Sequence, residues 1–340
     1  MYKQELETIA HKIVTDVKGI LAADESLPTI KKRFDTIQVE STEENRRAYR
    51  EMLFTTPGIE DFISGVILFD ETIRQATQDG VPFVELLSQK GVIPGIKVDN
   101  GAKELAGFVG EKITEGLDGL RDRLIEYRGI GAQFAKWRAV IKIGNNIPSQ
   151  LCLDANAHAL ARYAALCQDV GLVPIVEPEV LMDGKHDIKK CSDVTAAALK
   201  SVYLALFEHR VYLEGTLLKP NMILSGKDCP TQAGPEEVAQ ATISCFRQVI
   251  PAAVPGIVFL SGGQSSEQAT ENLNAMNTMG KHPWELSFSY GRALQEDALK
   301  AWKGAAANIT AGQKAIYHRA KCNGAARHGN YNREMESMPI

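Results

Sequence analysis

The amino-acid sequence predicts an α/β fold, a single (β/α)8 barrel of the TIM-barrel class, over residues 1–340. Short apolar runs that end in a polar residue alternate with longer stretches of helical spacing, which indicates βαβ units around a parallel sheet. Eight such runs are spread over the whole chain, and no Ser/Gly/Pro-rich linker divides them. This regular spacing favours one closed barrel over two smaller doubly wound domains.

The predicted strands cover residues 19–24, 65–70, 92–99, 137–143, 172–177, 213–219, 257–261 and 286–289. Residues that are typical of helix ends lie between these predicted strands. The segment 41–44 (STEE) and the segment 265–268 (SSEQ) read as capping boxes, and Pro235 suits a first helical turn. Gly171 suits the end of a helix over 155–170. These signals mark helices after the first, fourth, sixth and seventh predicted strands.

Helical stretches are also expected before the first strand and after the eighth, the latter over 293–307 and 311–320. Beyond residue 321 the sequence turns polar and loses its periodicity. Residues 321–340 are either a mobile lid or a frayed end, and we interpret them as a flexible C-terminal tail.

Composition excludes several function classes. The chain has 44% hydrophobic and 24% charged residues, and 38 basic against 42 acidic side chains leave a net charge of −4. This balance supplies no general attraction for nucleic acid or an anionic membrane, so neither is an expected partner. The six cysteines include no C-x-x-C pair, and the N-terminus lacks the apolar segment of a signal peptide. We expect reduced thiols and a cytoplasmic protein.

The residues that close the apolar runs are the candidate functional residues, because a parallel barrel carries its active site at the C-terminal ends of its strands. These positions are unusually polar. They comprise Asp24, Lys97, Lys136, Arg138, Lys142, Glu177, Glu179, Lys219, Ser261 and Arg292.

Lys219 follows an apolar run, where an amine can be desolvated, lose its proton near neutral pH and attack a carbonyl. A second cation would favour the loss of that proton, and Lys136 is a candidate for that charge. The alternative is a lysine that lays its aliphatic stem along the barrel rim. Spacing alone leaves both interpretations open.

Glu177 and Glu179 are two residues apart, so both carboxylates point to one side of an extended strand. Such a pair can act as a proton shuttle, or it can form structural salt bridges with neighbouring lysines. Asp24 has a similar ambiguity, because it could instead cap the segment that follows it.

Two loops resemble a phosphate site. Ser261-Gly262-Gly263 follows the seventh strand, and Ser289-Tyr290-Gly291-Arg292 follows the eighth. Glycines let backbone N–H groups approach an anion, and barrels of this kind often bind phosphate at this pair of loops. The alternative for the Gly-Gly pair is an ordinary tight turn.

The sequence predicts no metal site. The seven histidines form no H-x-H or H-E-x-x-H pattern, and we expect none of them to pair with a cysteine at a ligand spacing. They are interpreted as surface or core residues. A Walker loop and a G-x-G-x-x-G motif are also absent from the sequence.

From residue 6 to about residue 303 the sequence resembles class I fructose-bisphosphate aldolases. Nine ordered motifs carry the resemblance: ILAADES (20–26), STEENRRAYR (41–50), GVILFDET (65–72), GIKVD (95–99), FAKWR (134–138), PIVEPE (174–179), YLEGTLLKPNM (212–222), FLSGGQS (259–265) and FSYGRALQ (288–295).

The resemblance implies a role for each candidate. Lys219 would be the Schiff-base lysine, Glu177 the acid/base of imine formation, and Asp24 a charge that orients the substrate. Lys136 and Glu179 would complete the catalytic centre. The remaining residues are implied contacts to substrate or phosphate: Lys97, Arg138, Ser261, Gly262, Gly263, Ser289, Gly291, Arg292 and Ser26.

The resemblance also implies the reaction: reversible cleavage of fructose 1,6-bisphosphate to dihydroxyacetone phosphate and glyceraldehyde 3-phosphate, in glycolysis and gluconeogenesis or, in a photosynthetic source, the Calvin cycle. It implies no metal or other cofactor, a sugar-phosphate substrate and a homotetramer. Rival readings are a barrel aldolase acting on a monophosphate and a non-catalytic sugar-phosphate binder.

The chain departs from the vertebrate family pattern in two places. Leu27-Pro28-Thr29 stands where vertebrate members usually have Thr-Gly-Ser, next to Ser26. The vertebrate pattern also ends in a tyrosine that reaches the active site, whereas this chain ends in isoleucine. The hypothesis for this chain is that Tyr331 takes the place of that tyrosine.

Overall fold

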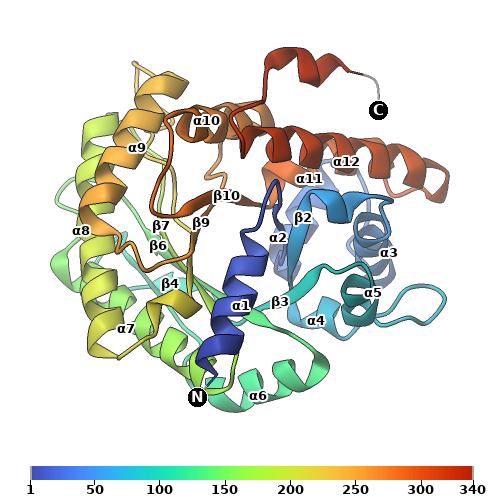
Figure 1. The fold of residues 1–340 in the computed structure, drawn as a ribbon, viewed down its shortest axis with the longest axis horizontal. Helices are drawn as coiled ribbons and strands as arrows, with labels where there is room; N and C mark the ends of the chain where they lie inside the picture. Colours follow the sequence, from blue (N-terminus) through green and yellow to red (C-terminus); the bar gives the residue numbers. More distant parts are fainter. Residues whose placement is uncertain (1, 339–340) are drawn as a thin grey trace.

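Eight parallel strands close into a barrel in the computed structural model, which describes residues 2–338 (Figure 1). Their order around the barrel follows the chain, and the last strand pairs with the first. The predicted fold class is therefore confirmed. The barrel strands are β1 (Gly19–Ala23), β2 (Ile63–Leu68), β3 (Ile93–Lys97), β6 (Phe134–Ile141), β7 (Val173–Val180), β8 (Leu217–Leu218), β9 (Gly256–Phe259) and β10 (Glu285–Tyr290).

Helices surround the barrel and connect its strands (Figure 1). The α-helices are α1 (Lys3–Ile13), α2 (Leu27–Asp35), α3 (Glu43–Phe54), α4 (Asp70–Ile73), α5 (Phe83–Gln89), α6 (Leu120–Ile130), α7 (Gln150–Asp169), α8 (Ile188–Glu208), α9 (Pro235–Val249), α10 (Ser266–Thr278), α11 (Arg292–Trp302) and α12 (Ile309–Ala326). Short 3-10 helices are η1 (Ile59–Asp61), η2 (Leu213–Gly215), η3 (Ala306–Asn308) and η4 (Arg333–Ser337).

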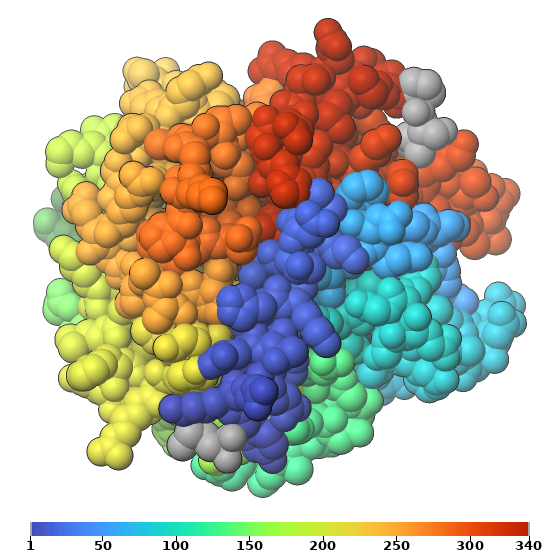
Figure 2. Space-filling model, in the orientation of Figure 1, coloured from blue at the N-terminus to red at the C-terminus, as the bar shows by residue number. Residues whose placement is uncertain are grey.

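The barrel interior is a packed apolar core that α1 closes at one end. Ile67, Phe134, Ile175 and Val258 belong to the same buried cluster as the apolar face of α1. Figure 2 shows the N-terminal segment, in dark blue, lying across the middle of this face of the molecule. A larger buried cluster fills the space between the strands and the outer helices. Because α1 covers one end of the barrel, a site in the barrel is expected at the other end.

Several elements differ from the sequence-based expectation. The first part of the sixth predicted strand is the 3-10 turn η2, and β8 keeps only Leu217–Leu218. An antiparallel hairpin of β4 (Ala102–Glu104) and β5 (Lys112–Thr114) was not predicted, because both strands are short and largely polar. The capping residue of α3 is Thr42, whose hydroxyl accepts from the Asn45 N–H. The box that caps α10 is confirmed.

The C-terminal segment also differs from the expected polar tail, because α12 continues to Ala326. Arg327 is buried and donates to the backbone carbonyls of Val14 and Lys18, next to the first strand. Tyr331 is only 7% exposed. Polar residues dominate this segment, yet they fold against the barrel layer through specific hydrogen bonds that a hydrophobic pattern does not reveal.

A buried ion cluster connects the end of β1 to the outer layer. Glu25 is paired with Arg33 and Arg50 and accepts a hydrogen bond of 2.9 Å from Gln295 Nε2. Burial alone would raise the pKa of Glu25, but the charges of Arg33 and Arg50 outweigh it and lower that pKa. Glu25 therefore adds stability above its unfolded-state pKa, and this contribution is lost as the pH falls through its folded-state pKa.

Replacing Arg50 by methionine is expected to lower the free energy of unfolding by about 3 kcal/mol, because it leaves part of the Glu25 charge buried without its partner. The unfolding midpoint in urea at pH 7 measures the change. The matched control is Lys31→Met, which breaks the exposed Lys31–Asp35 pair and should cost below about 1 kcal/mol. Equal losses in the two variants would contradict the prediction.

No helix among residues 2–338 combines the length and the apolar character that a membrane crossing requires.

Candidate active site

The C-terminal ends of the barrel strands surround a cavity of about 730 Å³. Of the residues predicted from the strand ends, Lys142 is exposed and lies outside the cavity lining. All the others line the cavity: Asp24, Ser26, Lys97, Lys136, Arg138, Glu177, Glu179, Lys219, Ser261, Gly262, Gly263, Ser289, Gly291 and Arg292. Residues up to 268 positions apart in the chain thus share one pocket.

The alternation of side chains along each strand explains this convergence. Val173 and Ile175 of β7 point into the barrel core, so Glu177 and Glu179 on the same strand point the same way at the open end. The same alternation applies to two further pairs of residues. Phe134 and Leu217 lie in the barrel core, and Lys136 and Lys219, two residues later, line the cavity. In these strands the first inward-facing residues are apolar and fill the core. The inward-facing residue at the C-terminal end is polar and lines the pocket.

Four charged side chains form a continuous chain of ion pairs across the pocket floor. Lys219 Nζ lies 3.3 Å from Glu177 Oε1, and Lys136 Nζ lies 3.1 Å from Glu177 Oε2. Lys136 Nζ also lies 2.7 Å from Asp24 Oδ2. The side chains of Lys219, Glu177 and Lys136 are at most 5% exposed. Glu177 thus lies between two amines in a site from which most water is excluded.

The surroundings fix the charge of Lys136 and Asp24. Burial would lower the pKa of Lys136, but Asp24 and Glu177 outweigh it and raise that pKa well above its usual range. Burial would raise the pKa of Asp24, but the charges of Lys136 and Lys219 hold it well below its usual range. At neutral pH Lys136 is therefore a fixed cation beside Glu177, and Asp24 is a fixed anion.

A second group of charges lines the wall next to this chain. Lys97 Nζ lies 2.9 Å from Asp99 Oδ1 and also donates to the Asp99 carbonyl at 2.8 Å. Arg138 pairs with Glu179. The Asp99 carboxylate also accepts from the Arg138 backbone N–H, at 3.3 Å. These contacts hold two cations at the pocket wall, where an anionic ligand can reach them.

The opposite wall is built to receive an anion. The Ser289 hydroxyl is 1% exposed and has no hydrogen-bond partner among the described residues. Gly262 and Gly263 have φ values of 54° and 84°, a left-handed conformation that glycine adopts without strain. Gly291 begins α11 without a side chain that could cap its N–H groups. A buried, unpaired hydroxyl beside open backbone donors suits a phosphate group.

Arg292 stands at the edge of this wall. Its guanidinium donates to the Gln264 carbonyl at 2.6 Å and lies 3.2 Å from Glu296. The side chain of Arg292 is 42% exposed, so part of its donor set stays open to a ligand. Ser26, at the start of α2, shares a 3.0 Å hydrogen bond with the Thr29 hydroxyl.

Comparison with known proteins agrees with this geometry. A family model described as fructose-bisphosphate aldolase class-I matches residues 5–339. The chain belongs to the class I fructose-bisphosphate aldolase family. It is 60% identical over 329 residues to a probable fructose-bisphosphate aldolase class 1 of Xanthomonas campestris, covering 96% of this chain and 98% of that protein.

Two further aldolases are similar to this chain. The chain is 58% identical to fructose-bisphosphate aldolase 4, cytosolic, of Arabidopsis thaliana, over 96% of this chain and 84% of that protein. A solved structure of fructose-bisphosphate aldolase from Plasmodium falciparum, in complex with TRAP and a small-molecule inhibitor, has a TM-score of 0.96 and 50% identity. That match covers 97% of this chain and 96% of the solved chain.

The pocket of this aldolase contains residues that sequence reasoning did not select. Asp99, Arg33 and Lys103 also line it. Asp99 closes the third apolar run, so the strand-end rule could have found it. Arg33 lies in α2 and Lys103 in the β4–β5 hairpin, away from any strand end, and no sequence pattern placed them there.

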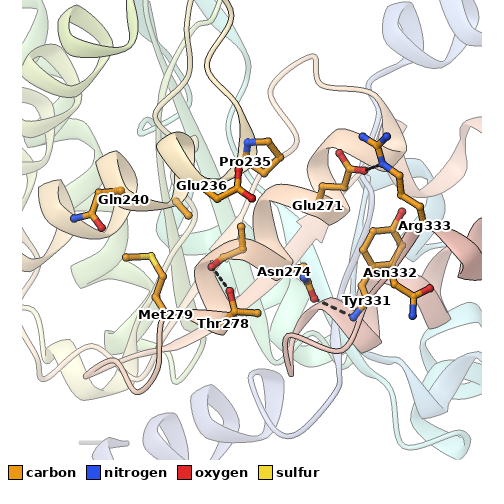
Figure 3. Close-up of a pocket in the computed structure, with 12 residues that line it drawn as sticks. Pro235, Glu236, Gln240, Glu271, Asn274, Thr278, Met279, Tyr331, Asn332 and Arg333 are labelled. Carbon is orange, nitrogen blue, oxygen red and sulfur yellow. Dashed lines mark hydrogen bonds and ion pairs between the residues drawn. The ribbon is translucent and has the colours of Figure 1, made fainter.

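Tyr331 lies outside this pocket. It borders a separate cavity of about 610 Å³ between α9, α10 and the C-terminal segment (Figure 3). Its backbone N–H donates to Asn274 Oδ1 at 2.9 Å, and its hydroxyl donates to Glu336 at 2.7 Å. The structure therefore does not bring Tyr331 to the aldolase site, and the hypothesis of a substitute tyrosine has no geometric support in this arrangement.

Proposed function

We propose that Lys219 forms a Schiff base with the C2 ketone of fructose 1,6-bisphosphate, and that Glu177 transfers the protons that this requires. The chain is a class I fructose-bisphosphate aldolase, an aldehyde-lyase of glycolysis. The observation that carries the residue assignment is the position of Glu177 between Lys219 and the fixed cation Lys136. Within the part of the chain that the structure describes, Lys219 has one carboxylate partner, whereas Lys136 also pairs with Asp24.

Imine formation needs an uncharged amine for the attack and then a proton donor for the loss of water. Glu177, 3.3 Å from Lys219 Nζ, accepts the proton that frees the amine for attack on C2. The resulting carbinolamine loses its hydroxyl as water after Glu177 returns a proton to it. Lys136 keeps its charge throughout and stabilises the Glu177 carboxylate when that group is ionised.

Carbon–carbon cleavage follows from the iminium. The Glu177 carboxylate, which the loss of water left ionised, accepts the C4 hydroxyl proton, the bond between C3 and C4 breaks, and its electron pair moves toward the iminium nitrogen. Glyceraldehyde 3-phosphate leaves, and an enamine remains on Lys219. Protonation of this enamine at C3 and hydrolysis of the imine by water release dihydroxyacetone phosphate and restore the amine. Asp24, a fixed anion near Lys136, orients the substrate hydroxyls in this sequence.

The two ends of the substrate are both anionic, and the pocket offers two sets of donors. One phosphate is assigned to the wall of Ser261, Gly262 and Ser289, with Gly263, Gly291 and Arg292 beside it. The other end is assigned to the cations Lys97 and Arg138, with Ser26 as a further contact. Two such sets support a bisphosphate rather than a monophosphate substrate.

The iminium supplies the electron sink for this route, so we propose that the reaction needs no metal or other cofactor. We further propose a cytoplasmic homotetramer whose substrate is a sugar phosphate and which has no nucleic-acid or membrane partner. The cytosolic Arabidopsis relative supports the location.

A trapping experiment tests the assignment. The enzyme is incubated with dihydroxyacetone phosphate, reduced with borohydride and mapped by peptide mass spectrometry, with a chelator-treated sample alongside. We expect one adduct, on Lys219, in both samples. An adduct on Lys136, or one that disappears after chelation, would contradict the proposed route.

A further inference from the structure

A second group of reactive side chains lies on α12, outside the barrel mouth. His318 and Cys322 are four residues apart, so they project from the same face of the helix. Glu336 of η4 folds back onto that face. One ligand atom from each of these three residues lies within 4.8 Å of the other two. The expectation that no histidine pairs with a cysteine at a ligand spacing is therefore wrong, because one helical turn brings them together.

The distances are close to those of a metal centre. His318 Nε2 lies 3.8 Å from Cys322 Sγ and 3.9 Å from Glu336 Oε2. Bonds of about 2.0 to 2.3 Å in a tetrahedral zinc site place neighbouring ligand atoms about 3.4 to 3.6 Å apart. The two His318 distances are within about 0.5 Å of these values, and the Cys322 and Glu336 ligand atoms lie within 4.8 Å of each other. Side-chain rotations that draw Cys322 and Glu336 together would let one ion contact all three atoms.

The surrounding contacts orient Glu336 and leave one of its lone pairs open. Oε1 accepts from the Tyr331 hydroxyl at 2.7 Å and from Arg319 Nη1 at 2.8 Å. Among residues 2–338, Oε2 accepts only from Arg319 Nη2, at 2.6 Å, so its second lone pair is available on the side of His318. Partners that hold a ligating carboxylate in this way are usual around metal sites.

The protonation states are compatible with metal binding. Burial and the Arg319 charge lower the pKa of His318, which keeps its imidazole neutral at pH 7. Burial raises the pKa of the Cys322 thiol to about 11, so an arriving ion must displace that proton. The Arg319 charge opposes a cation, whereas the Glu336 carboxylate and the Cys322 thiolate attract it.

We propose that His318, Cys322 and Glu336 bind one transition-metal ion of the zinc class, with a fourth position left for water. Nitrogen, sulfur and oxygen donors together suit zinc or cobalt, whereas calcium and magnesium prefer oxygen ligands alone. The ion would fasten η4 to α12 and so hold the end of the chain against the barrel layer. This site is separate from the proposed Schiff-base chemistry and supplies no step of it.

Cobalt(II) is the probe, because its spectrum reports both the geometry and the thiolate ligand. The full chain is treated with chelator, desalted and titrated with Co²⁺. We expect a thiolate-to-metal charge-transfer band and tetrahedral d–d bands that saturate at one equivalent. Cys322→Ser should abolish the charge-transfer band, and His318→Gln should weaken Co²⁺ binding at least about tenfold. Zn²⁺ should displace the cobalt and raise the melting temperature.

The matched control is Cys229→Ser, which removes a partly exposed thiol elsewhere in the chain and should leave the spectrum unchanged. Aldolase turnover confirms that each variant is folded, since none of these residues lines the barrel mouth. If Cys322→Ser fails to fold, His318→Gln decides the question alone. A spectrum without a charge-transfer band, or bands that survive His318→Gln at unchanged affinity, would overturn the proposal.

Discussion

Replacement of Lys219 by methionine is expected to lower kcat for fructose 1,6-bisphosphate cleavage by about 10⁴-fold or more, because the nucleophile of the covalent route is lost. Methionine keeps the length and approximate volume of the buried side chain, which is 4% exposed. The packing of the barrel end is therefore largely preserved. A coupled assay that follows triose phosphate release measures the rate, and borohydride trapping should give no adduct.

The control for this experiment is Lys142→Met. Lys142 also follows a barrel strand, but it is exposed and lies outside the pocket, so its removal should leave kcat within about twofold. If the Lys219 variant kept more than about a hundredth of the original activity, nucleophilic catalysis by this lysine would be refuted.

Replacement of Glu177 by glutamine is expected to lower kcat by about 10²- to 10⁴-fold, because an amide can neither accept the proton of Lys219 nor return one to the carbinolamine. The nucleophile remains in this variant. Single-turnover borohydride trapping should therefore show a slow rise of the Lys219 adduct toward a normal end point. A dead, misfolded protein would instead give no adduct at any time.

Glu179→Gln provides the comparison on the same strand. Glu179 points to the same side as Glu177, but its ion-pair partner is Arg138 rather than the two lysines. We expect this substitution to change KM more than kcat, because it releases a proposed substrate-binding cation. A Glu177 variant that trapped substrate as fast as the original enzyme would contradict proton transfer by Glu177.

The barrel could be predicted because each of its strands is defined locally. A run such as 19–24 is apolar, short and closed by Asp24, and a buried strand needs little else. Strand ends are not defined locally where the chain turns. η2 replaces the first part of the sixth predicted strand, because Leu213–Gly215 forms a 3-10 turn that contacts α1, and the chain does not encode that contact locally.

The site shows the same division. Lys219, Glu177 and Asp24 were selected because they close apolar runs and match family motifs. The sequence could not predict that Glu177 lies between Lys219 and Lys136. Those distances depend on the register of three neighbouring strands, which no local pattern encodes. Arg33 was missed because it comes from a helix after the strand.

The sequence alone was enough to predict the barrel class and most of the charged groups at its open end. These depend on apolar periodicity and on the rule that parallel strands end at one edge. Only the folded structure shows which charges neutralise one another, which hydroxyl stays unpaired and how η4 folds onto α12. Those outcomes depend on distances of a few ångströms between segments remote in sequence, and Coulomb and hydrogen-bond energies change steeply over such distances.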